Sequence, residues 1–138
     1  MTNKQSERIF FIAGALLAGL AVAVGSFSAH GAVKMLSEDA VRWLAKGARY
    51  EMYHALALFP VVWALTYWPQ QAKTLKIAGW LFIAGTALFA GSLYLMAFTG
   101  ISLGYVTPAG GISYMLGWIA LAVAAWKGGA GLSPSERE

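Results

Sequence analysis

The chain has 138 residues, enough for one domain, and it combines 59% hydrophobic residues with only 12% charged ones. A soluble domain carries about 25% charged residues, so this composition excludes an ordinary water-soluble fold and indicates burial in a membrane. The net charge of +4 lies in loops and tails and does not predict nucleic-acid binding, and the absence of cysteine excludes disulfides and thiolate sites.

Four apolar runs follow one another along the chain. The first, residues 9–29, has 21 residues without a charge, and the others cover 52–68, 77–100 and 110–126. Each fits the roughly 17–25 residues that a helix needs to cross a bilayer. Lipid offers no hydrogen bonds to the backbone, so we expect four membrane-spanning helices. The first run exceeds the roughly 7–15 apolar residues of a signal peptide, and we expect it to be a span.

An amphipathic segment separates the first two runs. Ser37 is a helix-capping residue, and Glu38 and Asp39 suit the positive end of a helix. One face of residues 37–49 is charged and the other carries Trp43 and Leu44. The pattern predicts an amphipathic helix lying in the membrane interface, with a connecting helix packed on the bundle as the alternative.

The remaining connections are short or uncharged. The third loop ends in Thr107-Pro108 and Gly110-Gly111 and predicts a compact turn at the membrane surface. Residues 127–138 predict a flexible tail. The expected fold is therefore a single all-α integral membrane domain, residues 1–138: a bundle of four transmembrane helices with an amphipathic interfacial helix between the first two.

Basic residues are divided unequally between the two sides of such a bundle. Four spans place the N-tail, second loop and C-tail together, with Lys4, Arg8, Lys73, Lys76, Lys127 and Arg137. The other side holds Lys34, Arg42, Lys46 and Arg49. The excess on the first side predicts that both termini lie in the cytoplasm.

Polar residues gather where the first two runs meet. His30 ends the first run and His54 lies near the start of the second, so we expect both at a similar depth near the interface. Glu51 precedes His54 by three residues and shares its helix face. The candidate ligand or partner cluster comprises His30, Arg49, Tyr50, Glu51, Tyr53, His54, Thr107 and Pro108.

Three interpretations of this cluster remain open. It could pair the polar groups of two helix ends, as charged groups near membranes generally are paired. His30 and His54 could ligate a haem, whereas a di-metal site needs a second Glu-x-x-His unit that the chain lacks. Transport generally uses an ionisable group at mid-membrane, and the first, third and fourth runs contain no ionisable group except tyrosines. Without a Gly-x-Ser-x-Gly motif, we predict no catalytic residue, and we predict no metal or cofactor.

Four short motifs carry a resemblance to a known family. They are GSFSAHG from Gly25, YEMYHALAL from Tyr50, GSLYLMAFTG from Gly91 and TPAGG from Thr107. In this order they resemble the domain of unknown function 423 family, which includes transmembrane protein 256-like small membrane proteins. The resemblance covers nearly the whole chain. It implies a multi-pass protein of the bacterial inner membrane and implies no activity. Ser28 and Glu51 depart from the glycine and glutamine that the family pattern would have, which argues against an essential carboxylate.

These observations lead to a functional expectation. We predict a non-enzymatic accessory, scaffold or partner- or lipid-binding membrane protein. Its partners would be the lipid bilayer and a larger membrane complex or a homo-oligomer. A small transporter or ligand-binding membrane protein is the alternative, and a haem-carrying redox subunit is the third possibility.

Overall fold

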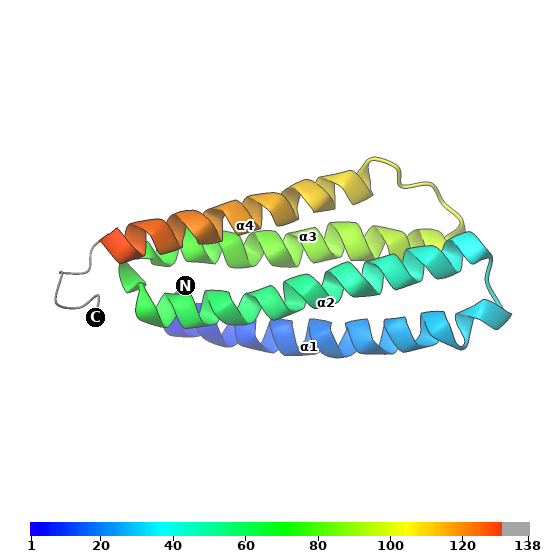
Figure 1. Cartoon of the computed structure of the whole chain (residues 1–138), viewed down its shortest axis with the longest axis horizontal. Helices are drawn as coiled ribbons and strands as arrows, with labels where there is room; N and C mark the ends of the chain where they lie inside the picture. The colour runs from blue at the N-terminus through cyan, green and yellow to red at the C-terminus, as the bar shows by residue number, and fades with distance from the viewer. Residues whose placement is uncertain (131–138) are drawn as a thin grey trace.

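The computed structural model describes residues 1–130, and the described chain is helical almost throughout (Figure 1). The long helices are α1 (Asn3–Ala29), α2 (Glu38–Tyr67), α3 (Ala72–Thr99) and α4 (Val106–Ala130). Two short 3-10 helices, η1 (Ala32–Lys34) and η2 (Pro69–Gln71), lie in the first two connections. The expected all-α membrane bundle of four long helices is confirmed. Residues 127–130 of the predicted tail are the last turn of α4, and the remainder of that tail lies outside the described residues.

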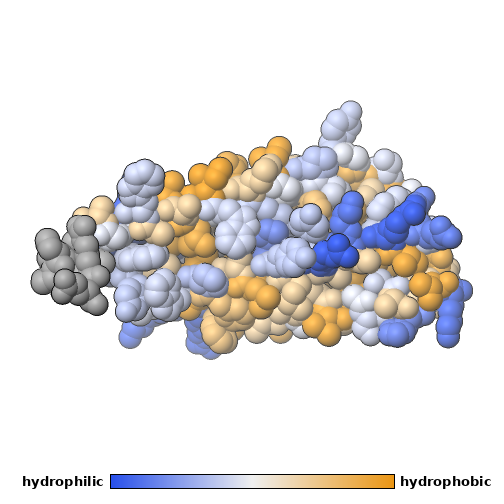
Figure 2. Space-filling model, viewed as in Figure 1, coloured by the Kyte–Doolittle hydropathy of each residue, from blue (hydrophilic) through white to orange (hydrophobic). Residues whose placement is uncertain are grey.

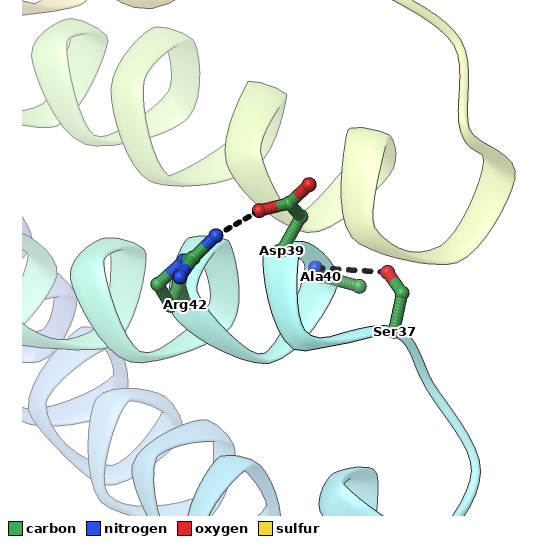
Figure 3. A network of polar contacts seen from close by, with 4 residues as sticks. All are labelled: Ser37, Asp39, Ala40 and Arg42. Carbon is green, nitrogen blue, oxygen red and sulfur yellow. Dashed lines mark hydrogen bonds and ion pairs between the residues drawn. The ribbon is translucent and has the colours of Figure 1, made fainter.

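Side-chain caps fix where the first two long helices begin. Thr2 Oγ1 accepts a hydrogen bond from the Gln5 amide at 3.1 Å, and Gln5 Oε1 accepts one from the Thr2 amide at 2.8 Å. At the start of α2, Ser37 Oγ accepts a hydrogen bond from the Ala40 amide at 3.2 Å, and Arg42 pairs with Asp39 (Figure 3). These bonds satisfy amide groups that have no partner within the helix.

The helices run alternately up and down and pack in chain order. α2 lies between α1 and α3, and α4 packs on α3, so α1 and α4 form the outer members of the row (Figure 1). The start of α1 and the end of α4 lie at the same end of the bundle. Lys76 Nζ, near the start of α3, donates a hydrogen bond to the Met1 carbonyl at 3.0 Å and closes that end.

Glycines allow these helices to approach closely. A Cβ on Gly79 would lie 2.5 Å from Phe10 Cζ, and one on Gly117 would lie 2.7 Å from Phe82 Cε1. Phe10 and Phe82 are fully buried in the main core, which also contains Leu58. Small residues at such contacts are typical of membrane helices, whose packing depends on close approach rather than on exclusion of water.

The polar segment before the second span differs from its prediction. Residues 37–49 are not a separate interfacial helix but the first part of α2, which runs without a break to Tyr67. No proline interrupts this stretch, and Gly47 is held against the Tyr94 ring, 2.6 Å from where its Cβ would lie. By length and composition, α1, α3 and α4 can each cross a membrane. α2 does not meet the same composition because residues 38–51 in its first half include six charged side chains.

The third connection also differs from its prediction. Thr107 and Pro108 belong to the first turn of α4 rather than to a surface turn, and the left-handed Gly100, with φ of 70°, ends α3. Proline fits the first turn of a helix because its missing amide hydrogen has no partner there in any case.

Candidate functional site

Two contacts set the register of α1 against α2. A Cβ on Gly25 would lie 3.8 Å from Ala48 Cβ, and one on Gly14 would lie 3.0 Å from the Ala55 carbonyl oxygen. The middle of the charge-free run 9–29 lies between these two contacts. Residues 48–55 of α2 are therefore level with residues 14–25 of that run, which include its middle. This differs from the expected position at the interface, because the first part of α2 continues along α1 instead of leaving it.

His54 lies in the middle of the bundle and is held on every side. It is 6% exposed, and its ring stacks on Tyr114 with centroids 3.4 Å apart. Trp118 Nε1 donates a hydrogen bond to His54 Nε2 at 3.2 Å. An indole is only a donor, so Nε2 must be the acceptor, and Nδ1 carries the proton that faces the Tyr50 carbonyl oxygen at 2.6 Å. The geometry therefore selects one neutral tautomer of His54.

Glu51 lies one helical turn before His54 and faces α3. Its residue is 1% exposed, and Oε2 accepts a hydrogen bond from the Tyr94 hydroxyl. Both side chains line a cavity of about 220 Å³ between α1, α2 and α3. A carboxyl group at this depth is the kind of intramembrane ionisable residue that generally marks a functional site.

Further polar bonds tie α4 to α3 along the same bundle. The Tyr114 hydroxyl donates to Thr86 Oγ1 at 3.1 Å, and Ser113 Oγ donates to the Leu81 carbonyl oxygen at 2.7 Å. Ser92 Oγ and Thr107 Oγ1 lie 2.5 Å apart. The buried cluster is thus a set of separate interhelical hydrogen bonds, two of which involve Glu51 and His54 of α2.

The structure brings together only part of the predicted cluster. Glu51 and His54 are buried in the bundle and Thr107 is bound to Ser92, but Arg49, Tyr50, Tyr53 and Pro108 are exposed. His30 is also exposed, at the end of α1.

The two histidines do not share a depth. Gly25 is level with Ala48, and His30 and His54 lie on opposite sides of this contact. At 1.5 Å per residue, they are separated by roughly 16 Å along the bundle. One chain therefore does not present both as ligands of one haem.

The buried cluster is poor in side chains that bind metal ions. Within residues 1–130, no three histidine, cysteine, aspartate or glutamate side chains come close enough together to hold a metal ion. The groups that surround Glu51 and His54 are hydroxyls, an indole and aromatic rings, which bind by hydrogen bonds and stacking.

Sequence reasoning missed the partners of the two buried residues. These are Tyr94, Tyr114 and Trp118, with Thr86 behind Tyr114. The position of Trp118 could have indicated one of them. It is the central residue of the run 110–126, where the indole N–H group needs a hydrogen-bond partner inside the protein. The sequence does not indicate that this partner is His54, which lies 64 residues away in the chain.

Comparison with known proteins places the chain in a family. The family described as Protein of unknown function (DUF423) matches residues 24–111. The chain is 42% identical over 121 residues to the UPF0382 membrane protein YwdK of Bacillus subtilis, covering 87% of this chain and 98% of that one. It is 36% identical to a UPF0382 membrane protein of Haemophilus influenzae, covering 77% and 84%. No solved structure matches. The chain is thus an integral membrane protein, and it belongs to the DUF423 family.

Proposed function

We propose that this protein is a non-enzymatic accessory subunit that docks against a larger membrane protein through one face of α2. This polar face consists of Arg42, Lys46, Arg49, Tyr50 and Tyr53, which recur at helical spacing and are all exposed. A strongly hydrophilic patch lies over the first half of α2 on the side of the molecule shown in Figure 2.

The depth of this face is the observation that carries the proposal. Arg49 follows Ala48, which is level with Gly25 inside the charge-free run of α1. An arginine or lysine at the centre of a membrane helix costs about 3 kcal/mol on insertion scales, and Arg49, which lies between the middle and the end of the run, costs less than that. Charged residues inside a membrane generally face protein or water. Tyr50 and Tyr53 add hydroxyl groups at the same level. A protein partner that covers this face would remove the cost.

The charge of the face indicates the chemistry of the partner. Within residues 1–130, the sole ion pair joins Arg42 to Asp39, so Lys46 and Arg49 are available to acidic groups. A second copy related by a two-fold axis along the membrane normal would set these cations against their own equivalents. The expected partner is therefore a different membrane protein with carboxylates on the matching segment. Arginine and tyrosine are both enriched at protein interfaces.

The proposed setting follows from the distribution of basic residues. We place the protein in the bacterial inner membrane with the start of α1 and the end of α4 on the cytoplasmic side. The polar face of α2 then begins at the opposite surface, so its partner would present carboxylates in that half of the bilayer.

The test is affinity purification of the tagged, full-length protein from membranes in mild detergent, followed by mass spectrometry. We expect a stoichiometric membrane protein with the wild type and its loss with Lys46→Gln/Arg49→Gln. Lys73→Gln/Lys127→Gln removes two exposed cations elsewhere and is the matched control. Elution of the wild type alone, or with anionic lipid in place of a protein, would contradict the accessory role.

One observation favours a second candidate, a small transporter or ligand-binding membrane protein. Transport generally needs an ionisable group near mid-membrane, and Glu51 is level with the middle of the first apolar run. Saturable uptake into proteoliposomes that is lost with Glu51→Gln would support transport. Binding without uptake would restrict the role of Glu51 to ligand recognition.

A further inference from the structure

A groove between α1 and α3 has Glu51 of α2 in its wall. Its volume is about 220 Å³. The lining is otherwise apolar apart from Thr86 and Tyr94: Leu17, Leu20, Ile83, Ala87, Ala90 and Gly91. Leu20 is 49% exposed, and a Cβ on Gly91 would meet nothing within 4 Å. The groove therefore opens sideways toward the surrounding lipid.

The carboxyl group of Glu51 is only partly satisfied in this wall. Oε2 accepts from Tyr94, whereas Oε1 has no hydrogen-bond partner among residues 1–130. In the same residues, no fully buried side-chain oxygen or nitrogen lacks a partner, so Oε1 retains some exposure, and Glu51 is among the residues that line the groove. No lysine, arginine or histidine of the described chain forms an ion pair with Glu51. A carboxylate in apolar surroundings is costly without a cation or further hydrogen bonds.

We propose that this groove binds a lipophilic amine, with its ammonium group on Glu51 and its hydrocarbon chain along Leu17, Leu20 and Ile83. An ammonium supplies the positive charge that the wall lacks and donates to Oε1. The apolar lining holds the first part of the chain. The cavity is smaller than the roughly 300–1,000 Å³ of pockets that enclose drug-sized ligands. The remainder of the chain therefore leaves through the open side into the lipid.

This site is independent of the docking face of α2. Glu51 is two residues from both Arg49 and Tyr53, which turns it about 200° away from them around the helix. A ligand in the groove would contact α1 and α3 and leave the polar face of α2 free. The two proposals can therefore fail separately.

The test measures binding of octylamine, which is an ammonium ion at neutral pH, and of octanol, which has the same chain without the charge. The full-length protein is placed in nanodiscs of zwitterionic lipid, and heats from empty nanodiscs are subtracted. We expect saturable octylamine binding at least about tenfold tighter than octanol binding. Equal binding of the two probes would mean that the groove holds hydrocarbon only, and this would overturn the proposal.

Two variants assign the binding to the groove. Glu51→Gln keeps an acceptor for Tyr94 and should weaken octylamine binding at least about tenfold while leaving octanol binding unchanged. Gly91→Leu adds a large side chain at the open side, where a Cβ meets nothing within 4 Å, and should abolish octylamine binding. Gly19→Leu, also in open space but outside the groove lining, is the control and should bind like the wild type. Unchanged octylamine binding in Glu51→Gln or in Gly91→Leu would overturn the proposal.

Discussion

Trp118 in α4 and His54 in α2 are joined by a hydrogen bond from the indole Nε1–H to the imidazole Nε2, at 3.2 Å. α4 packs mainly on α3, so this bond is one of few links between α4 and α2. The stacking of His54 on Tyr114 adds a second link between the same two helices. In the middle of the bundle, α2 and α4 are therefore linked directly through His54, although each of them packs mainly on other helices.

Removing this link should loosen the bundle measurably. Trp118→Phe keeps a ring but loses the donor, and we expect the free energy of unfolding to fall by about 1 kcal/mol. Unfolding in mild detergent, followed by circular dichroism, measures the change. Trp126→Phe alters an indole that is 82% exposed and should change stability by less than about 0.5 kcal/mol. Equal effects of the two substitutions would show that the bond to His54 contributes nothing.

The hydrogen bond between Tyr94 and Glu51 predicts which substitution in this pair destabilises the fold more. Tyr94→Phe leaves Glu51 Oε2 buried without a donor and should destabilise the fold by about 1–3 kcal/mol. Glu51→Gln retains an oxygen that accepts from Tyr94, so its cost should be smaller. The same unfolding assay ranks the two, and a larger loss in Glu51→Gln would mean that the charge of the carboxylate itself stabilises the bundle.

Glycine substitutions should separate packed contacts from open ones. A Cβ on Gly110 would meet the backbone of Phe89, 2.8 Å from its Cα, and backbone cannot move aside as a flexible side chain can. Gly110→Ala should therefore destabilise by about 1–3 kcal/mol. Gly91→Ala meets nothing and should stabilise α3 by up to about 1 kcal/mol. Thermal unfolding of both variants in one detergent measures this difference in stability. Equal stabilities would mean that α4 does not pack against α3 at Gly110.

The bond between Thr107 and Ser92 should secure the start of α4. Thr107→Val preserves the shape of the side chain and removes the hydroxyl, so the bond at 2.5 Å is lost. Amide hydrogen exchange near residues 106–112 should become several-fold faster, since about 1 kcal/mol of local stability is removed. Exchange measured by mass spectrometry in detergent tests this. Thr66→Val, at an exposed threonine, is the control, and a uniform increase along α4 would argue against local anchoring.

The sequence predicts the helices better than their registers. Each apolar run lies along one long helix, because an uncharged stretch of this length has few other ways to satisfy its backbone in lipid. The prediction of a separate helix over residues 37–49 is wrong because it rests on composition alone, which suits a membrane surface. Their position is decided by tertiary contacts such as Gly25 on Ala48 and Gly47 on Tyr94, which are far apart in the chain.

In the candidate site, too, the sequence predicts the residues better than their positions and contacts. Glu51 and His54 stand out in the sequence because they are ionisable and border an apolar run. Their depth and partners depend on where α1, α3 and α4 lie along the axis of α2. These relative positions cannot be read directly from a single sequence. The sequence associates His30 with them only because it ends the neighbouring run, and in the structure His30 is exposed.

The order of packing has a consequence for how the protein is made. Each long helix rests chiefly on the one before it, and the last does not return to the first. A chain of this kind can form most of its contacts while it is still being synthesised, one hairpin after another. The first two helices can already be joined through their glycine and alanine contacts when α3 emerges from the ribosome. Biogenesis would then be completed by α4, whose arrival closes the bonds around His54 and Ser92.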